Sequence, residues 1–400
     1  MRSTLPPVDT GRSLPQKKTP QGRTRVLHMN YTRNRANETV ETEQAYLRFF
    51  AQTAQKLGVC LEILTGLQSV EDVKAELSKD TYSGLDYRLA VSPTPVSKWA
   101  EDSVEYLANG RMAVLTPFHD GLLAWAMVEG RRRRWQSLVV PEILADILEH
   151  DDQWIPLGIR VNSSQTGQAR SRITQAQGQS VGHIRAYVEG GNMITGEDQT
   201  GQPIILVGKD AIATTGSLYQ LTEPEVKQII QEDFGLDTPE QVISVEQPGQ
   251  FHLDMGLLFI GNGVVVINDS RAALQDAQEM AELAPCETTR VMAAKRQLQC
   301  QLEAIATQDL TAARLEVIPK ALANDVMYNF FNGEFVEGGD RCQYYITNGG
   351  PKPQEETFTQ LMVQEWRVVN QVLFSPQSIA HKSLQERGGV GCRLKGSPWT

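Results

Sequence analysis

The order of apolar and polar stretches repeats along this chain, and this repetition constrains the fold more than any other feature. From near Val26 onward, strand, strand, helix and strand follow one another roughly five times, in units of about 60–75 residues. Clear members are the predicted strands CLEILTG (60–66) and RLEVIP (314–319) and the predicted helix EPEVKQIIQEDFG (223–235). Strands that alternate with helices predict an α/β fold, and the repetition favours one pseudo-symmetric domain over residues 25–400.

Residues 1–24 lack the apolar residues that would bury enough area to fold, so we expect a disordered tail. No apolar run approaches the roughly 20 residues that a membrane helix needs, and the N-terminus lacks a secretory apolar region. The five cysteines form no CxxC pair, which favours a reduced, cytoplasmic setting.

The net charge of −10 argues against nucleic-acid binding, which requires a basic surface. The run Arg131 to Arg134 is a local exception, and we interpret it as a solvated loop rather than a docking patch. A second stretch, the polar residues from Asn162 to Gly182, is also expected to be a loop.

The stretch QPGQFHLDMGLLFIGNGVVVIND (247–269) is predicted to form an apolar hairpin, yet it contains His252 and Asp254. In a strand, residues two apart point to one face. A buried charge without a partner is costly, so both groups need hidden partners or a polar cavity. A structural and a functional role remain equally open on these residues alone.

Paired glycines follow a glutamate in YVEGGNMITG (187–196), which indicates a bulge or a close backbone approach. A bulge would aim Glu189 and Asn192 into a cavity. A second copy of the motif, FVEGGDRC (335–342), contains Glu337, and either copy could instead be a hairpin turn.

Two further stretches combine residue types that suit cation binding and nucleophilic chemistry. In KWAEDSVEYL (98–107), Trp99 precedes Glu101 and Asp102. An aromatic ring and neighbouring carboxylates could together hold a flat cation. In ERGGVGCRLKG (386–396), Cys392 lies among glycines and basic residues, which favour a reactive thiolate. The alternatives are a solvated turn and a surface cysteine.

The order Asp102, Glu189-Gly-Gly, His252-x-Asp254 and Cys392 resembles the guanidino-group-modifying enzymes. These include agmatine deiminase, arginine deiminase, protein-arginine deiminase and the amidinotransferases. The resemblance covers roughly residues 25–400 and implies the pentein fold, a five-bladed ββαβ propeller with pseudo-fivefold symmetry, which agrees with the repeat. Trp99-x-x-Asp102 is most similar to the protein-arginine deiminases, and the Arg-Asp-Thr-Gly-Pro run expected of agmatine deiminases is missing.

The resemblance implies a role for each of these side chains. Cys392 attacks the guanidinium carbon, His252 is the general acid and base, and Glu189 orients it. Asp102 and Asp254 grip the guanidinium, and Trp99 and Asn192 complete its binding site. Glu189 is preferred over Glu337 because family members place this motif before the histidine.

The resemblance leaves the substrate open. The leading hypothesis is hydrolysis of arginine in peptides or proteins to citrulline and ammonia. Agmatine or free arginine as substrate, an amidinotransferase, and a non-catalytic binding module are the alternatives. We expect no metal and no cofactor, leave calcium dependence open, and consider a homodimer.

Overall fold

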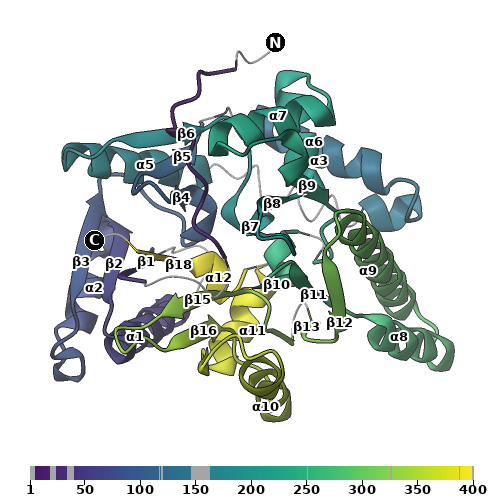
Figure 1. Ribbon diagram of the computed structural model, residues 1–400. Helices are drawn as coiled ribbons and strands as arrows, with labels where there is room; N and C mark the ends of the chain where they lie inside the picture. The colour runs from purple at the N-terminus through teal and green to yellow at the C-terminus, as the bar shows by residue number, and fades with distance from the viewer. Residues whose placement is uncertain are drawn as a thin grey trace.

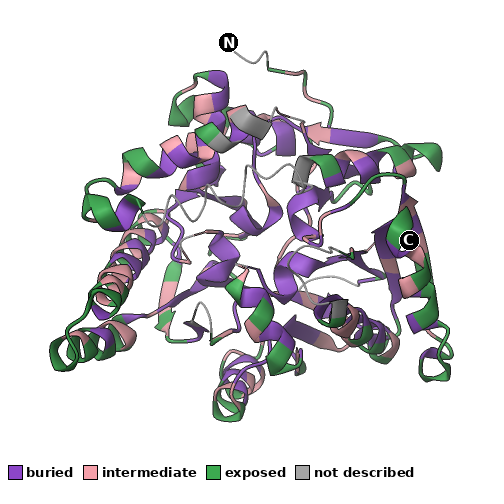
Figure 2. Ribbon diagram, turned by 180° about the vertical axis from the view of Figure 1, so that it is seen from behind, coloured by how far each residue is buried: buried purple, intermediate pink, exposed green. Residues whose placement is uncertain are grey.

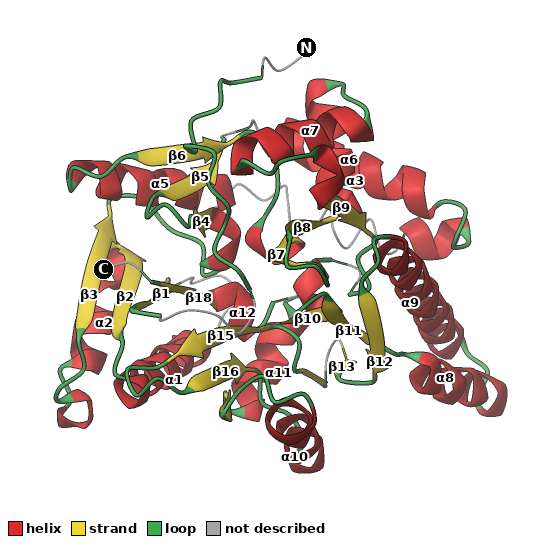
Figure 3. Cartoon of the chain, viewed as in Figure 1, coloured by secondary structure: helices red, strands yellow, loops and turns green. Residues whose placement is uncertain are grey.

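The strands of the molecule form several small sheets rather than one large sheet. The computed structural model describes residues 5–18, 24–33, 40–116, 118, 120–145, 163–249, 251–324, 327–386 and 388–398. Within these ranges there are five sheets of three or four strands and one two-stranded sheet. The five larger sheets lie around a central region, and most helices lie outside them (Figure 1; Figure 3). The α/β class predicted from the sequence is confirmed.

The elements are labelled as in Figure 1. Residues 141–145 are also helical. The strands are β1 (Val26–Tyr31), β2 (Cys60–Gly66), β3 (Tyr87–Ser92), β4 (Val104–Tyr106), β5 (Met112–Leu115), β6 (Val181–Ile184), β7 (Met193–Glu197), β8 (Pro203–Gly208), β9 (Val242–Val245), β10 (Leu257–Gly261), β11 (Val264–Asn268), β12 (Glu316–Lys320), β13 (Ala323–Asn324), β14 (Tyr328–Asn329), β15 (Gly333–Glu337), β16 (Gln343–Thr347), β17 (Gln371–Phe374) and β18 (Leu394–Ser397). The α-helices are α1 (Val40–Leu57), α2 (Val70–Leu77), α3 (Asp120–Trp135), α5 (Ser163–Ala176), α6 (Lys209–Tyr219), α7 (Glu223–Phe234), α8 (Arg271–Leu283), α9 (Glu287–Ala312), α10 (Lys352–Gln360), α11 (Gln377–Gln385) and α12 (Val390–Arg393).

Four of the five sheets have the same internal order, and the first sheet repeats it with one more parallel strand, β3. An antiparallel hairpin comes first, and a third strand then joins it in parallel, as in β4–β5–β6 and β7–β8–β9. In the first sheet, β18 takes the place of the hairpin partner and pairs antiparallel with β1, so that Met29 lies opposite Leu394. The two ends of the domain therefore meet in one sheet.

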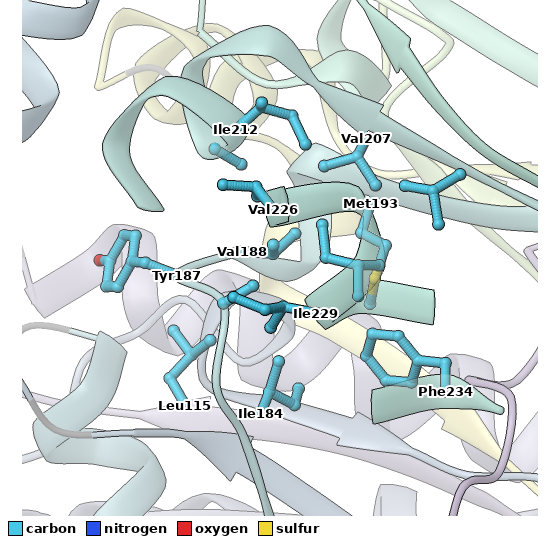
Figure 4. Packing of buried hydrophobic residues seen from close by; sticks show 14 of the residues in the cluster. Leu115, Ile184, Tyr187, Val188, Met193, Val207, Ile212, Val226, Ile229 and Phe234 are labelled. Atoms are coloured by element: carbon cyan, nitrogen blue, oxygen red, sulfur yellow. The ribbon is translucent and has the colours of Figure 1, made fainter. Parts of the chain in front are cut away.

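Helix α7 shows how the local sequence positions a helix on a sheet. Thr222 and Glu225 form a capping box at its start, and Gly235 ends it in a left-handed conformation. Its apolar residues Val226, Ile229 and Phe234 recur at helical spacing and are buried. They pack in an apolar cluster that contains residues of both the sheet β4–β5–β6 and the sheet β7–β8–β9, such as Leu115 and Val207 (Figure 4).

Two stretches that we predicted to be loops are helical. Residues 163–176 form α5, and some of its polar side chains have partners: Thr166 accepts a hydrogen bond of 2.8 Å from the Ser97 backbone N–H. Arg131 to Arg134 belong to α3. The Arg131 guanidinium is buried and donates to Asp210 at 2.7 Å, so the run is in part an internal ion-pair network rather than a solvated loop.

The N-terminal segment also differs from the disordered tail expected from composition. Residues 5–18 are described, and several of them contact the domain. Gln16 N–H donates to the Tyr106 carbonyl at 2.7 Å, and the Thr10 hydroxyl donates to the Asp233 carbonyl. Hydrogen bonds to the domain hold this segment in place, although it has few apolar residues to bury. Among the described helices, none combines the length and the apolar character that crossing a bilayer requires.

Candidate active site

Five short segments, each just before the first strand of a sheet, bring polar side chains to the centre of the molecule. Three of them are single 3-10 turns, η3 (Glu101–Ser103), η4 (Gly190–Asn192) and η6 (Leu253–Met255), and the centre is largely buried (Figure 2). The side chains are Asp102 before β4, Glu189 and Asn192 before β7, His252 and Asp254 before β10, Asn332 before β15, and Cys392 in α12 before β18.

His252 and Asp254 were expected on a strand, and this was wrong. His252 is the residue before η6, and Asp254 lies within that turn. The apolar stretch that follows forms β10 and β11 as predicted, so the two polar residues precede the hairpin. The turn still directs both side chains into one site.

The imidazole of His252 forms the centre of a hydrogen-bonded chain. Its Nε2 lies 3.0 Å from a Glu189 oxygen, and the Tyr187 hydroxyl donates to the other Glu189 oxygen at 2.9 Å. Burial opposes the charged imidazole, but the carboxylates of Asp102 and Glu189 raise the pKa of His252 to about 9. The imidazole is therefore protonated at neutral pH, the form that can donate a proton.

Two buried carboxylates leave oxygens for a cationic ligand. Asp102 Oδ1 and Asp254 Oδ1 have no hydrogen-bond partner among the described residues, and Asp102 Oδ1 lies 3.8 Å from His252 Nδ1. Burial raises the pKa of Asp102 to about 7, the His252 charge opposes this rise, and Glu189 adds to it. A bound guanidinium would supply both donors and positive charge to these oxygens.

Cys392 is 2% exposed and lies beside these carboxylates. Its sulfur, one nitrogen of His252 and one oxygen of Asp254 lie within 4.8 Å of one another. These residue types also occur as metal ligands, but we assign no metal to them. The Asn332 amide nitrogen lies 3.3 Å from the sulfur and 2.6 Å from Asp254 Oδ2, and so connects the two groups.

The surroundings of Cys392 disfavour its thiolate form, whereas the basic residues next to it in the sequence had suggested the opposite. Burial raises its pKa well above the usual value, and the charges of Asp254 and Asp102 add to this. The neighbouring cations are engaged elsewhere. Arg393 binds Glu43 at 2.7 Å and Lys395 binds Glu105 at 2.7 Å.

The glycines of the first Glu-Gly-Gly motif allow two site segments to approach closely. A Cβ at Gly191 would lie 2.6 Å from His252 Nδ1 and 2.9 Å from Asp254 Oδ1. A Cβ at Gly190 would lie 2.3 Å from the Glu101 carbonyl oxygen. This position of η4 against η3 and η6 therefore requires glycine.

The second Glu-Gly-Gly motif forms a hairpin turn between β15 and β16, as predicted. Glu337 pairs with Gln343 across the hairpin, and its carboxylate contacts Arg341 at 3.2 Å. No described contact links Glu337 to the site residues. The choice of Glu189 over Glu337 agrees with this geometry.

Trp99 and Asn192 lie near the site, and their contact with a bound cation stays a prediction. The Trp99 ring packs in a small cluster with Cys392, and the Arg393 guanidinium lies 4.9 Å from the ring centre. Asn192 packs against Gly208 of β8, and its side-chain oxygen has no partner among the described residues. The Trp99 ring therefore packs beside the Cys392 thiol.

Sequence reasoning missed Asn332 and Lys18. Asn332 is fully buried, accepts a 2.9 Å hydrogen bond from Gly391 N–H and so fixes the Cys392 segment. An asparagine inside the apolar stretch YNFFNGEF, directly before a strand, was a usable signal. Lys18 gave no local signal, because its partners are distant in sequence.

The pKa values predict how activity depends on pH. Because the pKa values of His252 and Cys392 are both raised, neutral pH favours the protonated form of each, and one proton must leave before the thiolate–imidazolium pair exists. We expect kcat/KM to rise about tenfold per pH unit from 7 to near 9, the pKa of His252. A pH profile measured from 6 to 10 checks this, and a flat profile would show a preformed ion pair.

Comparisons with known proteins agree with this architecture. No family model and no curated protein matches the sequence. A solved structure of a protein provisionally named agmatine deiminase matches with a TM-score of 0.63 and 14% identity, over 100% of this chain and 99% of that one. Agmatine deiminase of Enterococcus faecalis matches with a TM-score of 0.60 and 12% identity, over 100% of both chains.

At these identities the likeness establishes the fold. The chain has the α/β fold of these two structures, in agreement with the fold class predicted from the sequence. Both structures match this chain along their whole length and bear the agmatine deiminase name.

Proposed function

We propose that this protein is a cysteine-dependent hydrolase of the guanidino group of a small cationic compound, with agmatine as the first candidate. One observation carries the proposal: ligand atoms of Cys392, His252 and Asp254 converge within 4.8 Å, beside carboxylate oxygens that accept no hydrogen bond from any described residue. A thiol, an acid–base group and a cation grip are the parts that guanidinium hydrolysis needs.

The burial of the site favours a small substrate over the peptidyl-arginine of our leading hypothesis. Cys392 and His252 are each 2% exposed, and Asp102 and Asp254 are buried. The likeness in fold to two agmatine deiminase structures points the same way. We therefore prefer the small-molecule alternative. We also propose that the five sheets form the blades of a propeller around this site.

The substrate itself helps to activate the nucleophile in this mechanism. Asp102 and Asp254 bind the guanidinium edge-on and hold its carbon near the sulfur. Burial and the nearby carboxylate charges keep the pKa of Cys392 high. The positive charge of the substrate offsets these carboxylate charges, so the thiol releases its proton to water as the substrate binds, and His252 keeps its own proton.

The thiolate then attacks the guanidinium carbon and forms a C–S bond. The protonated His252 donates its proton to the departing nitrogen, the C–N bond breaks and ammonia leaves. A thiouronium remains on Cys392. The neutral imidazole next takes a proton from water, the hydroxide attacks the same carbon, and the C–S bond breaks. The product carries a ureido group, and Glu189 orients the imidazole throughout.

The experiment that tests the proposal measures ammonia and ureido product from agmatine, free arginine and an acylated, amidated arginine, with and without calcium. We expect agmatine to give the highest kcat/KM. A tenfold preference for the blocked arginine, about 1.4 kcal/mol in the transition state, would restore the peptidyl hypothesis. Equal inactivity with all three would reject the proposed function.

Removing the charge of either gripping carboxylate tests the binding mode. We expect Asp102→Asn and Asp254→Asn each to lower kcat/KM for agmatine about tenfold or more, because a charge-assisted contact becomes neutral. Glu337→Gln, in the second Glu-Gly-Gly motif, is the matched control and should change kcat/KM less than twofold. An effect of Glu337→Gln as large as that of Asp102→Asn would contradict this assignment.

A further inference from the structure

The N-terminal segment, residues 9–18, runs from the outer sheets to the candidate active site. Figure 1 shows this segment as the dark purple coil that leads from the N-terminus toward the centre. Its backbone follows the end of β4, where Gln16 N–H donates to the Tyr106 carbonyl at 2.7 Å, and then reaches β7, where Lys18 N–H donates to the Thr195 carbonyl at 3.1 Å. The segment thus spans two of the sheets that supply site residues.

The domain packs closely against this segment. Thr10 is fully buried, and a Cβ at Gly182 of β6 would lie 2.9 Å from the Thr10 Cα. Asp9 Oδ2 lies 3.1 Å from the His183 ring. These contacts fix the direction of the segment before it reaches Lys18.

Lys18 connects two of the five site segments. Its ammonium group donates to the Glu101 carboxylate and to the Gly190 carbonyl at 2.8 Å. Glu101 precedes Asp102 in the chain, and Gly190 follows Glu189. A single cation therefore holds the cation-gripping segment against the segment that orients His252.

The charges around Lys18 keep it ionised. Burial opposes the charged form, but Glu101, Asp254 and Glu105 raise the pKa of Lys18 above its usual value. Without Lys18, the buried Glu101 carboxylate would stand unneutralised beside Asp102 and Asp254. An uncompensated buried charge is strongly unfavourable, and these groups would move apart or take up protons.

We propose that Lys18 is a positioning residue for the guanidino chemistry, which holds Glu101 and the Gly190 carbonyl and so sets Asp102 against the Glu189–His252 pair. This inference rests on the proposed function and extends it. It makes the N-terminal segment part of the active site, although no atom of Lys18 needs to touch the substrate.

The neighbouring lysine offers a matched control. Lys17 pairs with Glu197, and both side chains are about one-quarter exposed. We expect Lys18→Met to lower kcat/KM for agmatine at least tenfold and Lys17→Met to change it less than twofold. Lys18→Arg, which keeps the charge, should retain more activity than Lys18→Met and guards against a methionine variant that fails to fold.

A second substitution distinguishes charge compensation from simple anchoring. Adding Glu101→Gln to Lys18→Met removes the orphan carboxylate, and we expect at least a threefold recovery of kcat/KM over Lys18→Met alone. If Lys18 only anchored the segment, the double variant would be no better than the single one, and that outcome would overturn the proposal.

A measurement without substrate separates failure of this inference from failure of the proposed function. Iodoacetamide alkylation of Cys392, followed at the peptide level by mass spectrometry, should be at least threefold slower in Lys18→Met, because the unneutralised Glu101 opposes the thiolate. Lys17→Met should react like the unaltered protein. Equal or faster alkylation in Lys18→Met would overturn the role of Lys18, even in a protein that turns over no guanidino compound.

Discussion

Replacing Cys392 with serine is expected to lower the turnover of agmatine by at least about a thousandfold, because a hydroxyl is a far weaker nucleophile at neutral pH. The side chains are nearly isosteric, so the fold and the thermal midpoint should remain close to those of the unaltered protein. The measurement is ammonia release under saturating substrate, together with a thermal unfolding curve.

The other cysteines provide internal controls for this variant. Cys286 is exposed, Cys300 and Cys342 are half-buried, and Cys60 is buried in the first sheet. Each should tolerate serine with most of the activity intact. Full activity in Cys392→Ser, or loss of activity in Cys286→Ser, would show that the nucleophile has been placed wrongly.

Gly191→Ala should lower kcat/KM about a hundredfold or more without a change of any catalytic group. The added methyl would lie 2.6 Å from His252 Nδ1 and 2.9 Å from Asp254 Oδ1, so both side chains must move. Displacements near 1 Å in a reacting group have costs of this size. Steady-state kinetics with agmatine measures the effect.

The duplicated motif supplies the matched control for Gly191→Ala. Gly339 is the equivalent glycine of the second copy, and a Cβ there would lie no closer than 3.3 Å to another atom, the Gly58 carbonyl oxygen. Gly339→Ala should therefore leave kcat/KM within about twofold, as surface changes usually do. If the two alanine variants behaved alike, the close approach at Gly191 would have no catalytic importance.

The fold was predictable because its elements follow periodic patterns. CLEILTG forms β2 over the predicted residues, and the helix predicted over residues 223–235 forms α7, which ends one residue earlier at Phe234. The ion pairs were not predictable. Arg131 resembled a solvated charge until its partner Asp210, far along the chain, was known. Single sequences record residue types but not pairings of distant residues.

The sequence identified the residues of the candidate site, but it predicted their arrangement less well. Resemblance selected Asp102, Glu189, His252, Asp254 and Cys392, and the structure brings these residues to the centre. The shape of the His252 segment was wrong, because a strand and a turn that precedes a strand have similar apolar composition. A reactive thiolate at Cys392 was predicted from the basic residues next to it in the sequence. The pKa of this thiol depends instead on its burial and on the carboxylates that lie near it in the folded protein.

The pairing of β18 with β1 has a consequence for how the protein becomes active in the cell. The strand that closes the first sheet directly follows the segment that carries Cys392, so closure of the domain and delivery of the sulfur occur together. A ribosome completes residues 390–397 only after all other site residues have been made. If the proposed function is right, a growing chain contains the carboxylates and the imidazole before it contains the nucleophile, and we expect activity only after the last strand docks.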